Sequence, residues 1–174
     1  MKKWMIWCIM AVLLVSLTAC HNQTLPKECP DDFAIYFKWG IGENIFDTYN
    51  NKLTKDLISN GSAETTLTVD QETLELIYSE LLQNKIAYIG RYMDSQNLRG
   101  PLEGGFDQSP CATYQIRFHI NGKEFSVAGN ETAFAYRKKN RQAANFCNFV
   151  EFMEDLAMST PEYKSLPESS GGYM

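Results

Sequence analysis

The spacing of apolar residues changes along this chain, and that change limits the folds open to it. Over residues 114–120, apolar and polar residues alternate, which is the period of a β-strand with one buried face. Asn121-Gly122 follows, and a second β-rich run covers residues 123–127. Asn-Gly between two such runs is the strongest short-range signal for a tight hairpin. We therefore predict a β-hairpin here.

Shorter β-rich runs precede this hairpin, with Asn50-Asn51 and Asn60-Gly61 as turn residues among them. Four short strands in an antiparallel meander are the simplest interpretation. The runs cover residues 33–39, 45–50, 52–58 and 65–69.

Two other segments repeat apolar residues at spacings of three and four, which predicts amphipathic helices over residues 70–84 and 139–158. Asp70 or Thr68 is available to cap the first helix. The order is strands, helix, hairpin, helix. One antiparallel sheet with two helices packed on one face, an α+β fold, would bury both apolar stripes. We expect residues 31–160 to form one domain, and residues 161–174, which begin with Pro161, to form a flexible tail.

The N-terminus has the pattern of an export signal. Lys2 and Lys3 precede an uncharged, mainly apolar stretch of about 14 residues, shorter than the roughly 20 that a permanent transmembrane helix needs. The stretch ends in Leu17-Thr18-Ala19-Cys20.

That tetrapeptide resembles the lipobox of bacterial lipoprotein signal peptides. The resemblance implies that residues 1–19 are removed and that the Cys20 thiol receives a diacylglyceryl group, whose two chains suffice for stable anchoring. Residues 20–30 would then be a lipidated tether, and the domain would lie on the extracytoplasmic face of the cell membrane. The alternatives are ordinary cleavage after Ala19 and an uncleaved anchor.

Charge limits the partners. The chain has 16 basic and 21 acidic residues; removal of Lys2 and Lys3 leaves 14 basic residues and a formal charge of −7. Such a surface repels nucleic acid on average, so we expect no nucleic-acid partner.

Three cysteines remain after Cys20 is modified and Cys8 is removed with the signal. Cys29 and Cys111 each adjoin a proline in a loop-like segment, and an exported domain permits a disulfide between them. The alternative is three unpaired thiols, with Cys147 buried on the stripe of the second helix. No close Cys/His pair begins a zinc site, and we expect no metal or cofactor.

Catalytic groups are scarce, and we assign no catalytic residue. His119 shares the polar face of its strand with Gln115 and Arg117, which favours a solvated surface residue. No nucleophile elbow or phosphate-binding glycine motif is present in the sequence. The acidic pairs Asp31-Asp32 and Glu154-Asp155 keep open a hydrolase that works with carboxylates alone.

Residues 86–112 form a long glycine-rich gap that holds Tyr88, Tyr92 and Phe106. Loops of this length are uncommon in compact domains unless they are functional or disordered. The aromatic side chains suit a contact surface for an envelope protein or a glycan. The alternative is a loop that packs on itself or contains a further strand over residues 86–92.

Basic residues gather just where the second helix is expected to begin. A site for an anionic headgroup or a wall phosphate and a solvated turn are both compatible with this position. The residues are Arg137, Lys138, Lys139 and Arg141.

Residues 33–40 and 163–167 resemble segments of small uncharacterised lipoproteins from Gram-positive bacteria, a resemblance that implies no activity. The sequence therefore predicts a lipid-anchored, non-enzymatic binding or accessory module of the cell envelope. The alternatives are a small-ligand-binding or inhibitor-like domain and the carboxylate hydrolase.

Overall fold

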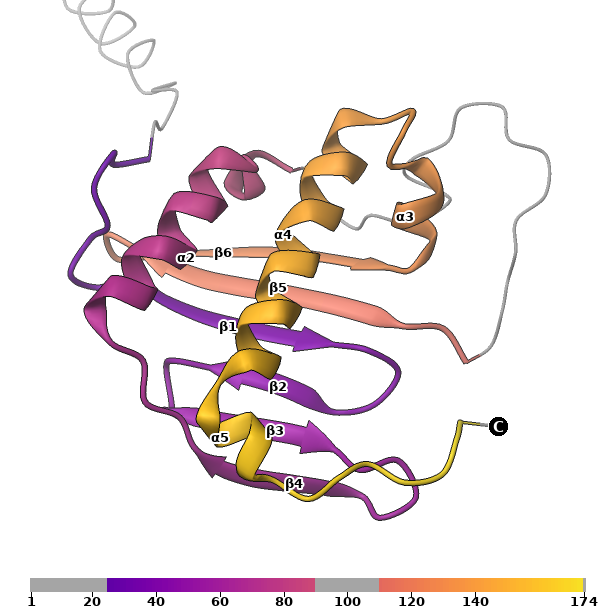
Figure 1. The fold of residues 1–174 in the computed structure, drawn as a ribbon. Coiled ribbons are helices and arrows are strands. Elements are labelled where there is room, and N and C mark those ends of the chain that lie inside the picture. The colour runs from indigo at the N-terminus through magenta and orange to yellow at the C-terminus, as the bar shows by residue number, and fades with distance from the viewer. Residues whose placement is uncertain (1–24, 90–109, 174) are drawn as a thin grey trace, which may run out of the picture.

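A computed structural model describes residues 25–89 and 110–173 of the chain. Its strands form one antiparallel sheet in the order β4-β3-β2-β1-β5-β6. The helices α2 and α4 lie across one face of this sheet (Figure 1). The predicted α+β fold, an antiparallel sheet with helices packed on one face, is confirmed.

The strands are β1 (Ala34–Trp39), β2 (Asn44–Asp47), β3 (Lys52–Asp56), β4 (Ser62–Thr66), β5 (Thr113–Ile120) and β6 (Lys123–Asn130). The helices are α2 (Gln71–Gln83), α3 (Thr132–Tyr136), α4 (Arg141–Ser159) and α5 (Pro161–Ser165), and a 3-10 turn, η1, covers Ile86–Tyr88.

Strand β1 joins the two predicted sets of strands into a single sheet. It pairs with β2 on one side and with β5 on the other, so that Phe37 lies between Phe46 and Ile116. All three side chains are buried. The β5–β6 hairpin turns at Asn121-Gly122, as predicted, and both residues have the positive φ that this tight turn requires.

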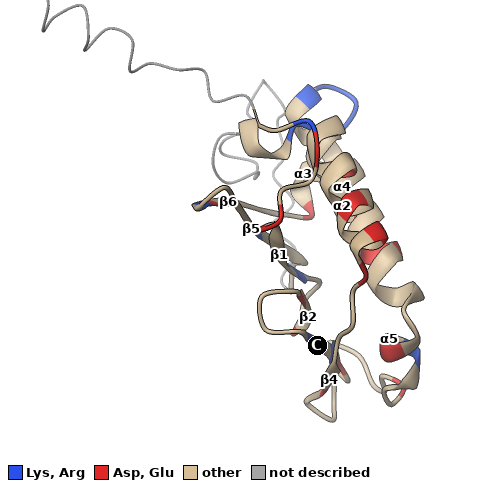
Figure 2. Ribbon diagram, turned by 90° about the vertical axis from the view of Figure 1, so that its left-hand side faces the viewer, with Lys and Arg blue, Asp and Glu red and all other residues tan. Residues whose placement is uncertain are grey.

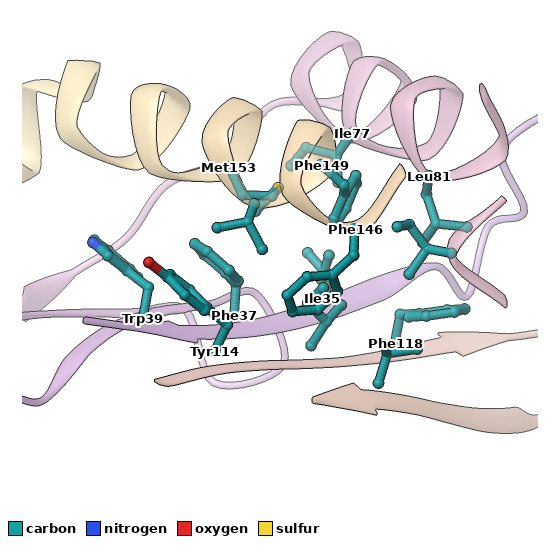
Figure 3. Close-up of a cluster of buried hydrophobic side chains, with 14 of the residues drawn as sticks. Ile35, Phe37, Trp39, Ile77, Leu81, Tyr114, Phe118, Phe146, Phe149 and Met153 are labelled. Atoms are coloured by element: carbon teal, nitrogen blue, oxygen red, sulfur yellow. The ribbon is translucent and has the colours of Figure 1, made fainter. Parts of the chain in front are cut away.

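The core lies between the sheet and the helices (Figure 3). Figure 3 shows Ile77 and Leu81 of α2 and Phe146 of α4 directed at the sheet. Burying a side chain of this size stabilises a fold by about 1.5–3 kcal/mol before conformational entropy is subtracted. The buried residues of α4 are Ala143, Phe146, Cys147, Phe149, Val150, Met153 and Ala157.

The start of each long helix is set by a side-chain cap. Asp70 accepts a hydrogen bond from the Thr73 backbone N–H at 2.8 Å. Asn140 accepts from the backbone N–H groups of Gln142 and Ala143 at 2.8 and 3.1 Å. Helix α4 therefore begins at Arg141 and not at the predicted residue 139.

The expectation of a flexible tail over residues 161–174 is wrong for most of its length. Pro161 does not only end α4; it occupies the first turn of α5, where its fixed φ suits a helix start and Thr160 caps the Tyr163 N–H. The Tyr163 ring lies 4.8 Å from Nζ of Lys55, a residue only 5% exposed. Further along, Ser170 N donates to the Leu57 carbonyl at 3.2 Å. The end of the chain thus packs on β3.

The predicted tether also ends earlier than residue 30. The side chains of Leu25 and Cys29 pack against the core, and the Tyr78 hydroxyl donates to the Pro26 carbonyl at 2.8 Å. The lipobox, including Cys20, lies outside the described residues. Among the helices of the described ranges, none has the length and apolar character to cross a membrane.

Candidate functional site

The described helices all lie on one side of the sheet, and they leave its opposite face uncovered. Figure 2 shows them gathered on one side of the strands. Because successive side chains of a strand point to opposite faces, β1 directs Tyr36 and Lys38 away from the helices, and β5 does the same with Gln115, Arg117 and His119. We call this the outer face.

His119 lies at the centre of a charged group on the outer face. Its Nε2 is 3.2 Å from Oδ2 of Asp32, and its Nδ1 is 3.1 Å from Oε1 of Glu124. A neutral imidazole can donate from only one nitrogen, so both contacts are hydrogen bonds together only when the ring is protonated. The imidazole thus contacts one carboxylate from the segment before β1 and one from β6, and it lies on the polar face of β5 as the alternation predicts.

Asp32 is fixed by the turn of the β5–β6 hairpin. Its carboxylate accepts hydrogen bonds from the backbone N–H groups of Asn121 and Gly122 at 2.9 and 2.8 Å. These bonds, together with His119, hold the pKa of Asp32 below its usual value. The segment that precedes β1 is thus attached to the outer face near its entry into the sheet.

Two aromatic residues complete the group. The Tyr49 hydroxyl lies 3.4 Å from the Glu124 carboxylate, and burial followed by this carboxylate raises the pKa of Tyr49 to about 12. The Arg117 guanidinium lies 4.1 Å from the Tyr36 ring centroid, a cation–π contact. A cavity of about 330 Å³ opens between Tyr49, Arg117 and Glu124. We call the group the outer-face cluster; its members are Asp32, Tyr36, Tyr49, Arg117, His119 and Glu124.

The cluster presents fixed hydrogen-bond donors, acceptors and aromatic surface, which are the groups used to bind a polar partner. The sequence placed Arg117 and His119 on this face, but it did not identify their partners. The two-residue turn at 121–122 could have supplied one, because it puts Glu124 directly opposite His119. Asp32 and Tyr49 carried no such signal, since they come from distant segments.

The predicted Cys29–Cys111 disulfide is absent, and Cys29 is a free thiol. Cys29 precedes β1, whereas Cys111 precedes Thr113, whose N–H bonds to Gly40 just beyond the other end of β1. A six-residue strand spans about 20 Å, but a disulfide needs Cα atoms within about 7 Å. Burial raises the pKa of Cys29, and burial raises that of Cys147 to about 11, which favours unreactive thiols.

A second cleft, of about 500 Å³, separates the segment around Cys29 from α2. Its lining includes the acidic residues Glu28, Asp31 and Glu75. Pockets for small molecules are mostly apolar with a few polar groups, and this charged cleft has a different character.

The predicted contact loop is only partly described. Tyr88 is 54% exposed, and its hydroxyl accepts a hydrogen bond from the Leu25 N–H at 3.3 Å. Ile86 and Ile89 on either side of it are buried, and the segment forms η1, so a strand over residues 86–92 is wrong for its described part. Tyr92 and Phe106 lie outside the described residues.

The four basic residues around the start of α4 do not act as one group. The Arg137 guanidinium donates hydrogen bonds to the side chains of Glu151 and Asn148 on α4, at 2.6 Å each. The capping side chain of Asn140 already accepts from two N–H groups of the first turn, those of Gln142 and Ala143. Lys138, Lys139 and Arg141 remain exposed on the surface.

The two acidic pairs, Asp31-Asp32 and Glu154-Asp155, lie in different parts of the fold. Asp32 belongs to the outer-face cluster, whereas Glu154 lies on α4, where burial and then the neighbouring Asp155 and Glu151 raise its pKa to about 7. Among the described residues, no group of three or more His, Cys, Asp and Glu side chains is placed to hold a metal ion. Comparison of the sequence with models of known protein families and with curated proteins finds no match.

Proposed function

We propose that the chain is a lipoprotein anchored through Cys20 on the extracytoplasmic face of the cell membrane, where it acts as a non-enzymatic binding or accessory module. The observation that carries the proposal is the outer-face cluster, a set of polar and aromatic side chains that is held in place by the fold and not covered by its helices. The partner is an envelope protein or glycan.

The geometry favours binding over catalysis. Each ring nitrogen of His119 lies within 3.2 Å of a carboxylate oxygen, so both nitrogens already have a partner within the protein. A general base must instead keep one nitrogen within hydrogen-bond reach of the proton that it takes. The outer-face cluster therefore replaces the 86–112 loop as the contact surface that we propose.

Anchoring and binding are tested separately. Mass spectrometry of the N-terminal peptide from the membrane fraction should show a diacylglyceryl adduct on Cys20, and an unmodified or uncleaved peptide would contradict the anchor. For binding, chemically cross-linked membranes are solubilised and the chain is recovered with its partners.

The variant Arg117→Glu should lose most of the cross-linked partner. Lys164→Glu, which makes the same charge change on exposed α5, is the matched control and should retain it. Equal recovery of partner with both variants would contradict a contact through the outer face.

A further inference from the structure

We propose that the end of the domain that carries Lys138, Lys139 and Arg141 rests on anionic phospholipid headgroups of the membrane that holds the anchor. This inference rests on the proposed lipidation of Cys20. It adds an orientation of the domain relative to the membrane. The lipid alone would leave the domain free to rotate, whereas the basic residues would keep one end of the domain toward the headgroups.

The first argument is the short distance between anchor and domain. The backbone N–H of Leu25 donates a hydrogen bond to the Tyr88 hydroxyl, and the Leu25 side chain packs on the core. The carbonyl of the next residue, Pro26, accepts a hydrogen bond from the Tyr78 hydroxyl. Cys20 is five residue steps before Leu25. A fully extended chain of that length spans at most about 18 Å. The surface around Leu25 and exposed Tyr88 must therefore stay close to the headgroups.

The second argument is where the exposed cations lie. Figures 1 and 2 both show the start of α4 at the same end of the domain as the chain's entry at residue 25, and α5 with β4 at the opposite end. Basic positions are coloured blue in Figure 2, and they include the turn before α4. Lys138 and Lys139 are exposed in the turn before α4, and Arg141 is exposed in its first turn. Each Lys or Arg within a screening length of about 10 Å of an anionic leaflet strengthens membrane binding by about 1 kcal/mol.

The third argument is the charge of the rest of the surface. The chain without residues 1–19 carries a formal charge of −7, and α2 and α4 both carry exposed acidic residues, among them Glu72, Glu75 and Asp155 (red positions in Figure 2). Those helix sides would be repelled by anionic lipid. The cations before α4 therefore make this end the favourable one to approach the membrane.

This orientation has a consequence for the proposed binding surface. With the α4 start toward the membrane, β6 lies nearest to the headgroups and β4 farthest from them (Figure 1). The sheet then stands upright, and its outer face looks sideways along the membrane surface. A partner in the same envelope layer could reach the outer-face cluster without displacing the domain.

The test is a lysine footprint of the purified, lipidated chain in vesicles. Acylation by an amine-reactive reagent is compared between vesicles of phosphatidylcholine alone and vesicles that also contain phosphatidylglycerol. Lys138 and Lys139 should react about threefold more slowly in the anionic vesicles, or slower still. Lys52 and Lys164, which lie away from this end, are internal controls and should react equally in both.

Paired variants identify the cause. In Lys139→Gln/Arg141→Gln, the remaining reporter Lys138 should lose its protection in anionic vesicles, whereas Lys52→Gln/Lys164→Gln should leave it unchanged. Equal reactivity of Lys138 in the two vesicle types, with Cys20 shown to be lipidated in the same sample, would overturn the orientation alone. An unmodified Cys20 would overturn the proposed anchoring and the orientation with it.

Discussion

The two faces of the sheet are built from alternate residues of the same strands, yet they have different chemistry. On β1, Phe37 points under the helices and is fully buried, while its neighbour Tyr36 points outward and meets Arg117. The inner face is filled with apolar side chains that stabilise the fold by leaving water. The outer face holds ion pairs and hydrogen bonds, which contribute little net stability when exposed. The inner face therefore supplies most of the stability of the fold, and the outer face is the surface that we propose for binding.

Substitutions at two adjacent residues of β1 should give the largest difference in stability between the two faces. Phe37→Ala should lower the free energy of unfolding by about 3–5 kcal/mol, because it leaves a cavity in the core. Tyr36→Ala should cost only about 1 kcal/mol, mainly the lost contact with Arg117. Denaturant unfolding of both variants measures the difference, and equal losses would show that the outer face is part of the structural core.

Glu154 on α4 tests the helix layer that covers the inner face. Its pKa is raised to about 7 from an ordinary 4.5, so the fold favours the protonated acid. This stabilising contribution is complete below about pH 4.5 and is lost as the pH rises through about 7. Glu154→Gln should therefore raise the free energy of unfolding at pH 8 by about 1–2 kcal/mol, after allowance for partial exposure, and change little at pH 4.5.

Unfolding curves at the two pH values check this prediction, with Glu75→Gln on the exposed side of α2 as the control. A gain that is equal at both pH values would contradict the raised pKa of Glu154.

The N-cap of α4 tests how much a side-chain cap stabilises the helix that covers the inner face. Asn140→Ala removes both hydrogen bonds to the first turn, and it should cost about 1 kcal/mol in thermal or denaturant unfolding. Asn140→Asp, which keeps the acceptor, should retain most of the stability. A loss of the same size in both variants would show that the side-chain oxygen is not the source of the effect.

The smallest effect on stability is expected on the outer face itself. Arg117→Ala should change the free energy of unfolding by no more than about 0.5–1 kcal/mol, because the residue is exposed and loses one cation–π contact. Its effect should appear in partner recovery, as for Arg117→Glu. A loss of several kcal/mol would show that Arg117 stabilises the fold and would contradict the difference between the two faces.

Sequence reasoning predicted the inner face better than the outer face. The alternation in β5, the Asn121-Gly122 turn and the helical spacing of α2 and α4 are local patterns, and the structure confirms each of them. They determined which residues point toward the core. They could not determine that β1 pairs with both β2 and β5, because pairing between distant strands depends on the whole set of apolar faces.

The outer-face cluster was largely beyond the sequence for the same reason. Asp32 and His119 are 87 positions apart, and they meet only because the turn N–H groups of Asn121 and Gly122 bind the Asp32 carboxylate. The packed tail is not predictable for a different reason: Pro161 is compatible with the end of one helix and equally with the first turn of another, and the sequence does not distinguish the two. The Cys29–Cys111 pairing failed because adjacency to proline carries no information about distance.

The most direct test of the binding surface is photo-cross-linking from the two sides of the domain in intact cells. A photoreactive residue is placed at Gln115, which is exposed on the outer face, or at Leu76, which is 47% exposed on the far side of α2. We predict a discrete cross-linked partner from position 115 and none from position 76. The same partner from position 76, with none from position 115, would contradict the account.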